Sequence, residues 1–198
     1  TAGSNEIVVQ AENDTGSSLA VTRTVTYTLT NTNDGSESDD PLVVQTGIRQ
    51  DIVTIPNEGS SHVRMFDTDG AVLTSFFAFN KDLKGSFQVL NTDINGDGEQ
   101  EILAAAGSGF GPHIRLFSRS GELITDFFAY SQDFRGGVKM YLSDLSGDDF
   151  PELLVTPVAD GGPHVRVYRY DVENEEFVLL TDFFPYSESF RGGVRITT

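Results

Sequence analysis

The sequence predicts an all-β fold built from tandem four-stranded units, and three observations support this prediction. An aromatic motif recurs with spacings of 51 and 56 residues, at Phe76–Phe79, Phe127–Tyr130 and Phe183–Tyr186. The three histidines of the chain, each followed by an apolar residue and an arginine, are 51 residues apart, at His62, His113 and His164. Helical periodicity is absent nearly everywhere. A repeat of this length is typical of solenoids, propellers and arrays.

One repeat contains four short strands. Alternating or continuous apolar residues predict them at Val138–Leu142, Leu153–Thr156, His164–Tyr168 and Val178–Phe184. Loops rich in Gly and Asp separate them, at Ser143–Asp149, Ala159–Gly162 and Asp171–Glu176. The last loop accounts for the longer 56-residue spacing. Four-stranded units in tandem favour the blades of a β-propeller over a sandwich.

The repeat divides the chain into blades at residues 42–84, 85–135 and 136–191, followed by the first strand of a further blade at 192–198. Residues 1–41 are expected to form an N-terminal β segment or arm, with strands predicted at Asn5–Val9 and Ala20–Thr30 and a flexible loop or linker predicted at Thr30–Asp40. This segment either completes the final blade, which gives about four blades, or completes a sheet in a neighbouring subunit. A third alternative is that the chain is a fragment of a larger ring.

Composition limits the classes of partner. The 198 residues carry a formal net charge of −17, which argues against nucleic acid and anionic membrane surfaces and favours cations. No Cys is present, so disulfides and thiolate metal sites are excluded. No run of 18 apolar residues predicts a membrane span, and Thr1 in place of Met indicates a processed chain. We expect an extracellular or cell-surface location.

One loop has the ligand spacing of a calcium site. Oxygen donors stand at alternate positions, with a glycine where the loop must turn, at Asp93, Asn95, Asp97, Glu99 (through its carbonyl) and Glu101. Calcium takes six to eight oxygens in irregular geometry, so these residues form a suitable cage. An EF-hand is excluded because Ala104 stands where a bidentate Glu is required and no helices flank the loop.

A second loop repeats this pattern 51 residues later. Its candidate ligands are Asp144, Ser146, Asp148, Phe150 (through its carbonyl) and Glu152. Ser146 replaces Asn95 and Asp149 replaces Gly98, so we expect weaker calcium binding here. The first blade has almost no ligands in the corresponding segment, Leu42–Asp51, and no calcium is expected there.

The loop at Asp93–Glu101 resembles FG-GAP repeats of the VCBS type, as do the segments Gly111–Phe117 and Gly162–Tyr168 and the Phe-Arg-Gly-Gly-Val turns at 134–138 and 190–194. The resemblance covers about residues 42–198. It implies integrin-alpha-like propeller blades, in which the aspartate loop between the first two strands holds structural calcium. It also implies an exported adhesin, surface protein or lectin, although fold alone does not define activity.

The other candidate residues favour structural roles. The three histidines are expected to be strand residues and not a shared metal site, because they lie on separate blades. The Phe-Phe pairs are expected to form the core between blades. A minority interpretation is a sugar-stacking platform, best represented by Tyr130, Tyr141 and Tyr186. No G-x-S-x-G motif or phosphate-binding loop is present, so we expect no catalysis.

The sequence therefore predicts a non-catalytic, calcium-stabilised extracellular module for surface attachment or recognition of an unidentified protein or glycan. The alternatives are a structural subunit of a filament or surface layer, joined by strand exchange, and a lectin. Heterologous contacts that do not close make filaments, and the unpaired strand predicted at residues 192–198 motivates that alternative.

Overall fold

The computed structural model describes residues 51–197. Several sequence-based predictions lie outside the described residues: the N-terminal segment 1–41 with its strands and linker, the start of the first blade at residue 42, and nearly all of the ligand-poor segment before Asp51.

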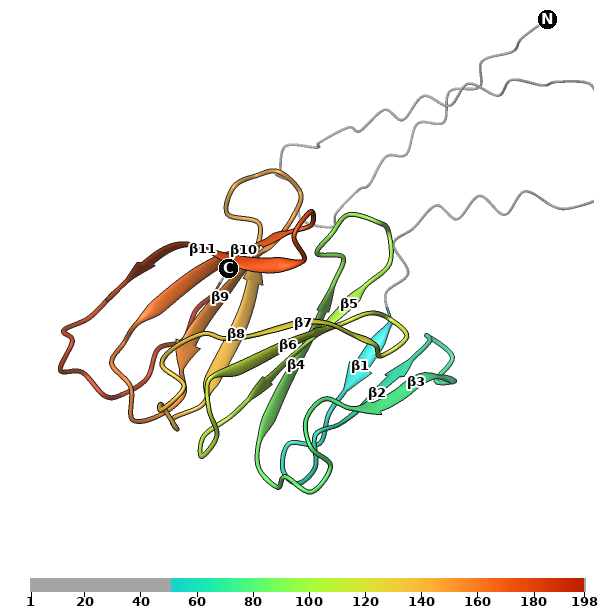
Figure 1. Ribbon diagram of the computed structural model, residues 1–198, viewed down its shortest axis with the longest axis horizontal. Helices are drawn as coiled ribbons and strands as arrows, with labels where there is room; N and C mark the ends of the chain where they lie inside the picture. Colours follow the sequence, from blue (N-terminus) through green and yellow to red (C-terminus); the bar gives the residue numbers. More distant parts are fainter. Residues whose placement is uncertain (1–50, 198) are drawn as a thin grey trace, which may run out of the picture. The chain divides into compact units, whose positions relative to one another are not determined.

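Eleven antiparallel strands form three sheets in the described part of the chain (Figure 1). The first sheet contains β1 (Ile52–Thr54), β2 (His62–Phe66) and β3 (Val72–Phe77). The second contains β4 (Phe87–Thr92), β5 (Glu101–Ala106), β6 (His113–Phe117) and β7 (Leu123–Phe128). The third contains β8 (Val138–Ser143), β9 (Glu152–Pro157), β10 (Val165–Asp171) and β11 (Glu176–Phe183). The prediction of an all-β fold is confirmed.

In every sheet, strands that follow one another in sequence are also neighbours in space, and the described sheets do not close into a barrel. No helix long and apolar enough to cross a membrane is found among residues 51–197.

Strand register shows which strands of the three sheets are equivalent. Thr54 pairs with Arg64 between β1 and β2, Ala104 pairs with Arg115 between β5 and β6, and Val155 pairs with Arg166 between β9 and β10. The three sheets therefore repeat one pairing pattern. In this pattern β1 corresponds to β5 and β9, so the first described sheet starts with the second strand of the repeat.

Successive sheets pack through equivalent faces. Val63 and Met65 of the first sheet pack against Ile102, Ala104 and Phe117 of the second. On the opposite face of the second sheet, another cluster joins it to the third, with buried residues Leu103, Ala105, Ile114, Leu116, Val138, Met140, Leu153, Val155 and Tyr168. Because strand side chains alternate between faces, the continuous apolar runs of β5 and β9 supply residues to both sides of a sheet.

The Phe-Phe pairs differ from the prediction that both rings lie in the core. Phe76 and Phe127 pack against the two inter-sheet clusters. The second ring of each pair is exposed, with Phe77 46% and Phe128 41% accessible. Each exposed ring stacks on a histidine of the same sheet, and the His113–Phe128 centroids are 4.5 Å apart. Alternation along a strand sends consecutive side chains to opposite faces, so only one ring of each of these two pairs reaches the core. In the third pair both rings, Phe183 and Phe184, are exposed.

Residues 192–197 form no strand in the described part of the chain, so the further strand predicted at residues 192–198 stays a prediction. Strand geometry needs a hydrogen-bonded neighbour. Within residues 51–197, no strand is hydrogen-bonded to this segment.

Candidate calcium loops

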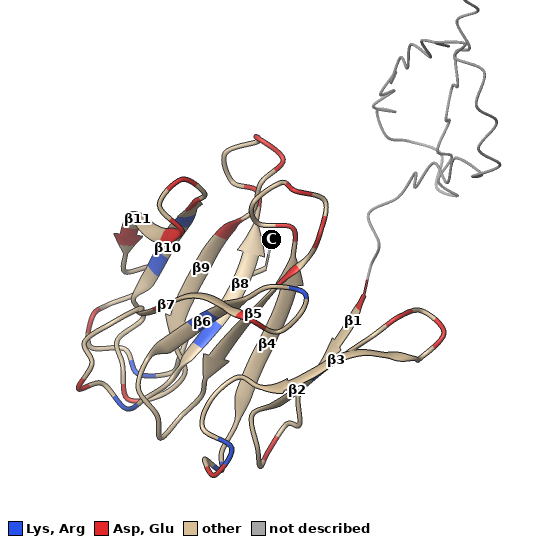
Figure 2. Cartoon of the chain, turned by 45° about the vertical axis from the view of Figure 1, so that its right-hand side comes forward, with Lys and Arg blue, Asp and Glu red and all other residues tan. Residues whose placement is uncertain are grey.

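The two predicted loops connect the first two strands of their sheets: Asp93–Gln100 lies between β4 and β5, and Asp144–Pro151 lies between β8 and β9. The loops touch each other, because a Cβ atom at Gly96 would lie 2.5 Å from the Phe150 ring. Figure 2 shows that many acidic residues lie in loops such as these and not in the strands. The fold therefore brings two acidic loops of consecutive sheets together.

Asp93 organises the first loop. The N–H groups of Gly96 and Gly98 donate to its two carboxylate oxygens, at 2.6 and 2.9 Å. Asn95 and Asp97 accept similarly from the N–H groups two residues later. Gly96 and Gly98 have φ values of 80° and 88°, in the left-handed region that favours glycine. The ligand spacing seen in the sequence thus coincides with a tight turn around one carboxylate.

Glu101 closes the first loop from the start of β5, where its exposed fraction is 3%. Its carboxylate accepts from the N–H of Ile94 at 3.1 Å and from the amide of Asn95 at 3.4 Å. Burial raises the pKa of Glu101 to about 7, and the negative charges of Asp97 and Asp93 add to the rise. Within residues 51–197, no basic side chain forms an ion pair with Glu101.

The second loop has the same main-chain design. Asp144 accepts from the N–H groups of Gly147 and Asp149, at 2.6 and 3.0 Å. Asp149 has a φ of 71° at the position of Gly98, so the left-handed turn is kept although the glycine is not. Asp tolerates this conformation better than most residues. The loop shape is therefore preserved where the sequence departs from the first copy.

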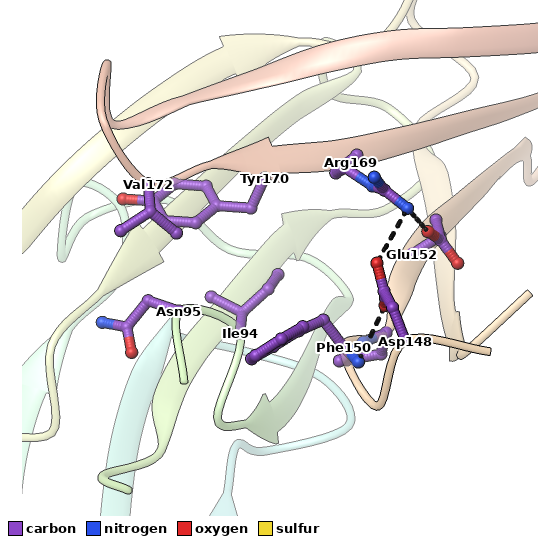
Figure 3. Close-up of a pocket in the computed structure, with 9 residues that line it drawn as sticks. Ile94, Asn95, Asp148, Phe150, Glu152, Arg169, Tyr170 and Val172 are labelled. Atoms are coloured by element: carbon purple, nitrogen blue, oxygen red, sulfur yellow. Dashed lines mark hydrogen bonds and ion pairs between the residues drawn. The ribbon is translucent and has the colours of Figure 1, made fainter. Parts of the chain in front are cut away.

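Arg169 distinguishes the second loop from the first (Figure 3). Its Nη2 atom donates to Asp148 at 3.1 Å and to Glu152 at 3.0 Å. Glu152, at the start of β9, is 1% exposed and corresponds to Glu101. Burial acts to raise the pKa of Glu152, but hydrogen bonds from Arg169 and the Leu145 N–H outweigh it, and the pKa is lowered. A guanidinium therefore supplies the positive charge that this loop requires.

The first loop has no equivalent of Arg169. By register, Ser118 stands at that position, and its hydroxyl bonds to Ser120 at 2.8 Å. Arg119 is next in sequence, but it pairs with Asp51 and Glu99, at 2.6 and 3.3 Å. The role of Arg169 was not predicted from the sequence. Alignment of the two repeats could have indicated it, because Arg169 stands where the preceding repeat has Ser118.

A pocket of about 220 Å³ lies between the loops. Ile94 and Asn95 of the first loop, Phe150 of the second loop and Arg169 of β10 are among the residues that line it (Figure 3). The pocket is smaller than typical small-molecule sites of roughly 300–1,000 Å³. We therefore assign it no organic ligand.

The predicted ligands are only partly brought together. Glu99 and Phe150 are exposed, and each donates its N–H to the Asp two residues earlier, Asp97 or Asp148. The Ser146 side chain bonds to Asp148 and Glu152. Among residues 51–197, no three acidic or histidine side chains are grouped closely enough to hold a metal ion. The donor chemistry of the first loop fits calcium, but its carboxylates are directed at the loop's own N–H groups. Calcium binding stays a prediction.

The histidines lie on three different sheets. His113 and His164 each contact a carboxylate of the adjacent strand, Asp126 or Asp182, at 2.7 Å. His62 contacts the Ser75 hydroxyl at 2.8 Å. These contacts, together with the stacked phenylalanines, indicate a structural role.

The candidate sugar-stacking tyrosines are separated as well. Tyr130 is held between sheets, where its hydroxyl lies 2.9 Å from the Val155 carbonyl oxygen. Tyr141 lies on β8 and is half-buried, whereas Tyr186 is 59% exposed after β11. No shared platform is formed by the three.

Comparison of the chain with protein-family models finds no match, and comparison with curated proteins finds no relative.

Proposed function

We propose that the chain is a non-catalytic, calcium-stabilised repeat module of the β-propeller type, of the FG-GAP/VCBS kind, that serves surface attachment or recognition outside the cell. The observation that carries the proposal is the difference between Glu101 and Glu152. Both are buried at the same position of consecutive sheets, but only Glu152 has a guanidinium partner. A buried carboxylate without a cation is costly, and a divalent ion at the first loop would remove that cost.

Asp93, Asn95, Asp97 and Glu101, with the Glu99 carbonyl, would hold the ion. Each Asp oxygen that accepts one N–H retains a second lone pair for a cation. The ion would supply positive charge and tie the loop to the start of β5, so its role is structural. At the second loop Arg169 takes this role, and calcium binding at Asp144, Ser146, Asp148, Phe150 and Glu152 is expected to be much weaker.

The experiment is calorimetric titration of the chelator-treated protein with calcium. We expect about one ion per chain, binding that is lost in Asp97→Asn, and binding that is kept in Asp148→Asn, which is the matched control at the other loop. No heat with any variant, together with a melting temperature that is equal in calcium and chelator, would refute the calcium part of the proposal.

A second candidate function is that of a self-assembling structural subunit. It is favoured by the exposed apolar residues of β11 and the segment after it: Val178, Leu179, Leu180, Phe183, Phe184, Tyr186 and Phe190. Monomeric proteins rarely leave so many large apolar side chains of one segment in water.

A further inference from the structure

The same contact occurs at both places where one described sheet meets the next. Arg115 of β6 donates to the Ala78 carbonyl at 3.0 Å, and its guanidinium lies 5.1 Å from the Phe79 ring centre. Arg166 of β10 donates to the Ala129 carbonyl at 2.7 Å and lies 4.8 Å from the Tyr130 ring centre. We call this contact the arginine–turn joint. It combines a charge-assisted hydrogen bond with a cation–π contact.

Arg64 occupies the arginine position of this joint on the first sheet. It pairs with Thr54 as Arg115 pairs with Ala104, but its side chain is exposed. Within residues 51–197 its guanidinium makes no hydrogen bond or ion pair, and it lies 5.2 Å from the ring centre of Phe66 on its own sheet. The first sheet therefore presents an arginine without the turn that its equivalents bind.

The residue that pairs with Arg64 on the neighbouring strand also differs from its equivalents: it is Ser75 and not an aspartate. It pairs with Arg64 at the position where Asp126 and Asp182 lie within 3.6 and 3.9 Å of the other two arginines. Arg64 thus has no carboxylate partner on its own sheet.

The turn that follows β11 is equivalent to the turns that bind Arg115 and Arg166, but no arginine binds it within residues 51–197. Pro185 and Tyr186 are the last two residues of the third aromatic motif, at the positions of Ala78–Phe79 and Ala129–Tyr130. Ala78 and Ala129 are fully buried, whereas Pro185 is exposed and Tyr186 is 59% accessible. Among the described residues, no arginine lies over the Tyr186 ring, and the aromatic ring nearest to it is that of Phe190, 5.3 Å away between centroids. Any residue supplies a carbonyl acceptor, so proline at this position keeps the turn able to bind an arginine.

Apolar side chains surround both unfilled halves. On the first sheet, Ile52 and Phe77 are 53% and 46% exposed on the face that carries Arg64. Next to the turn, Phe183 and Phe184 are 48% and 43% exposed. Each half therefore has the apolar surface that a protein contact requires.

We propose that a second copy of this chain fills each half, so that Arg64 of one copy inserts into the Pro185–Tyr186 turn of another. The second copy is chosen because both complementary halves lie on the same chain and reproduce a joint that the fold makes twice. By equivalence with Tyr130, which bonds to the carbonyls of Val155 and His164, the Tyr186 hydroxyl meets the carbonyls of Thr54 and His62. This contact is independent of the calcium proposal.

Because the contact joins Arg64 of one copy to Tyr186 of another, it predicts complementation between variants. Arg64→Glu destroys one half and Tyr186→Ala destroys the other, and each variant retains one intact half. We expect the wild-type chain to show mass that rises with concentration in sedimentation analysis. Each variant alone should remain at 21.6 kDa. Their equimolar mixture should form a heterodimer of twice that mass, about 43 kDa.

Two controls match the variants. Lys84→Glu makes the same change in charge at another exposed position, and Leu123→Ala removes an exposed apolar side chain from β7. Both should associate as the wild type does. Unchanged melting curves would verify that the variants fold. Tyr186→Phe provides a milder test, because it removes only the hydroxyl, and it should weaken association about tenfold.

A wild-type chain that stays monomeric at all concentrations would overturn the proposal, as would occupation of the turn by another part of the same chain. Association that both variants retain would also overturn it. A mixture that remains monomeric although the wild type associates would show that Arg64 and Tyr186 do not meet across the interface, which would also overturn the proposed joint.

Discussion

The Nη2 atom of Arg169 lies 3.0 Å from Oε1 of the buried Glu152, whereas the equivalent Glu101 one sheet earlier has Ser118 at the arginine position. The two loops share main-chain geometry and differ in the source of positive charge. In the third sheet the side chain of Arg169 supplies the positive charge, whereas in the second sheet Glu101 is a buried carboxylate without a basic partner. This difference leads to two of the predictions below.

Arg169→Ser is expected to convert the second loop to the chemistry of the first. Without calcium, the unfolding free energy should fall, because the buried Glu152 loses its cationic partner; the fall should be modest, because the Arg169 side chain is half exposed and solvent screens the pair. Calorimetric titration should then show a second calcium ion. The reciprocal change, Ser118→Arg, should abolish the effect of calcium on the melting temperature. An unaltered stoichiometry in both variants would show that the guanidinium does not replace a metal ion.

The stability of the calcium-free protein should decrease as pH rises from about 5 to 7. The folded-state pKa of Glu101, about 7, exceeds its ordinary value of 4.5, so the folded protein holds this proton more tightly than the unfolded chain. The contribution of Glu101 is therefore fully present below pH 4.5 and is lost as pH passes through 7, by about 3 kcal/mol at most. Urea unfolding in chelator measures it, with Glu101→Gln as the control that should lack this slope. Parallel pH profiles for the two proteins would contradict the assignment.

Gly137→Ala should destabilise the fold severely. Gly137 has a φ of 65°, and a Cβ atom there would lie 2.0 Å from the main chain of Gly107, which cannot move aside as a flexible side chain can. We expect a loss of about 3 kcal/mol in chemical unfolding. Gly70→Ala is the matched control: its φ is 83°, but no atom lies within 4 Å, so only the backbone term of about 1 kcal/mol applies. Equal losses would mean that the close approach of these segments is unimportant.

Tyr130→Phe should weaken the contact between the second and third sheets. The hydroxyl lies 2.7 Å from the His164 carbonyl and 2.9 Å from that of Val155, and both acceptors belong to the third sheet. Loss of this proton donor should lower the unfolding free energy by about 1–2 kcal/mol. Differential scanning calorimetry at low protein concentration measures the change. Tyr186→Phe, which removes an exposed hydroxyl, should leave the monomer's melting temperature as it is, and an equal shift in the two variants would argue against the inter-sheet role.

Much of the strand pattern could be predicted because its causes are local. Alternation in Val138–Leu142 and the apolar run Leu153–Thr156 predicted β8 and β9 to within one residue at each end. The Asp93 loop was recognisable because its turn requires Gly96 and Gly98 at fixed offsets. By contrast, alternation alone allows either ring of a Phe-Phe pair to face the core, so the exposure of Phe128 required the packing of the second sheet against the third.

The sequence by itself determined the repeat, the antiparallel strands and the positions of the two acidic loops, because propensity, turn chemistry and spacing act over a few residues. The tertiary structure alone decided that Arg169 reaches Glu152, since that contact depends on the pairing of β10 with β9 across 17 residues. It also decided that Arg115 and Arg166 donate hydrogen bonds to carbonyl groups of the preceding sheet, whereas Arg64 is exposed. Neighbouring sheets supply the carbonyl and the aromatic ring, and only packing in space determines which arginines receive them.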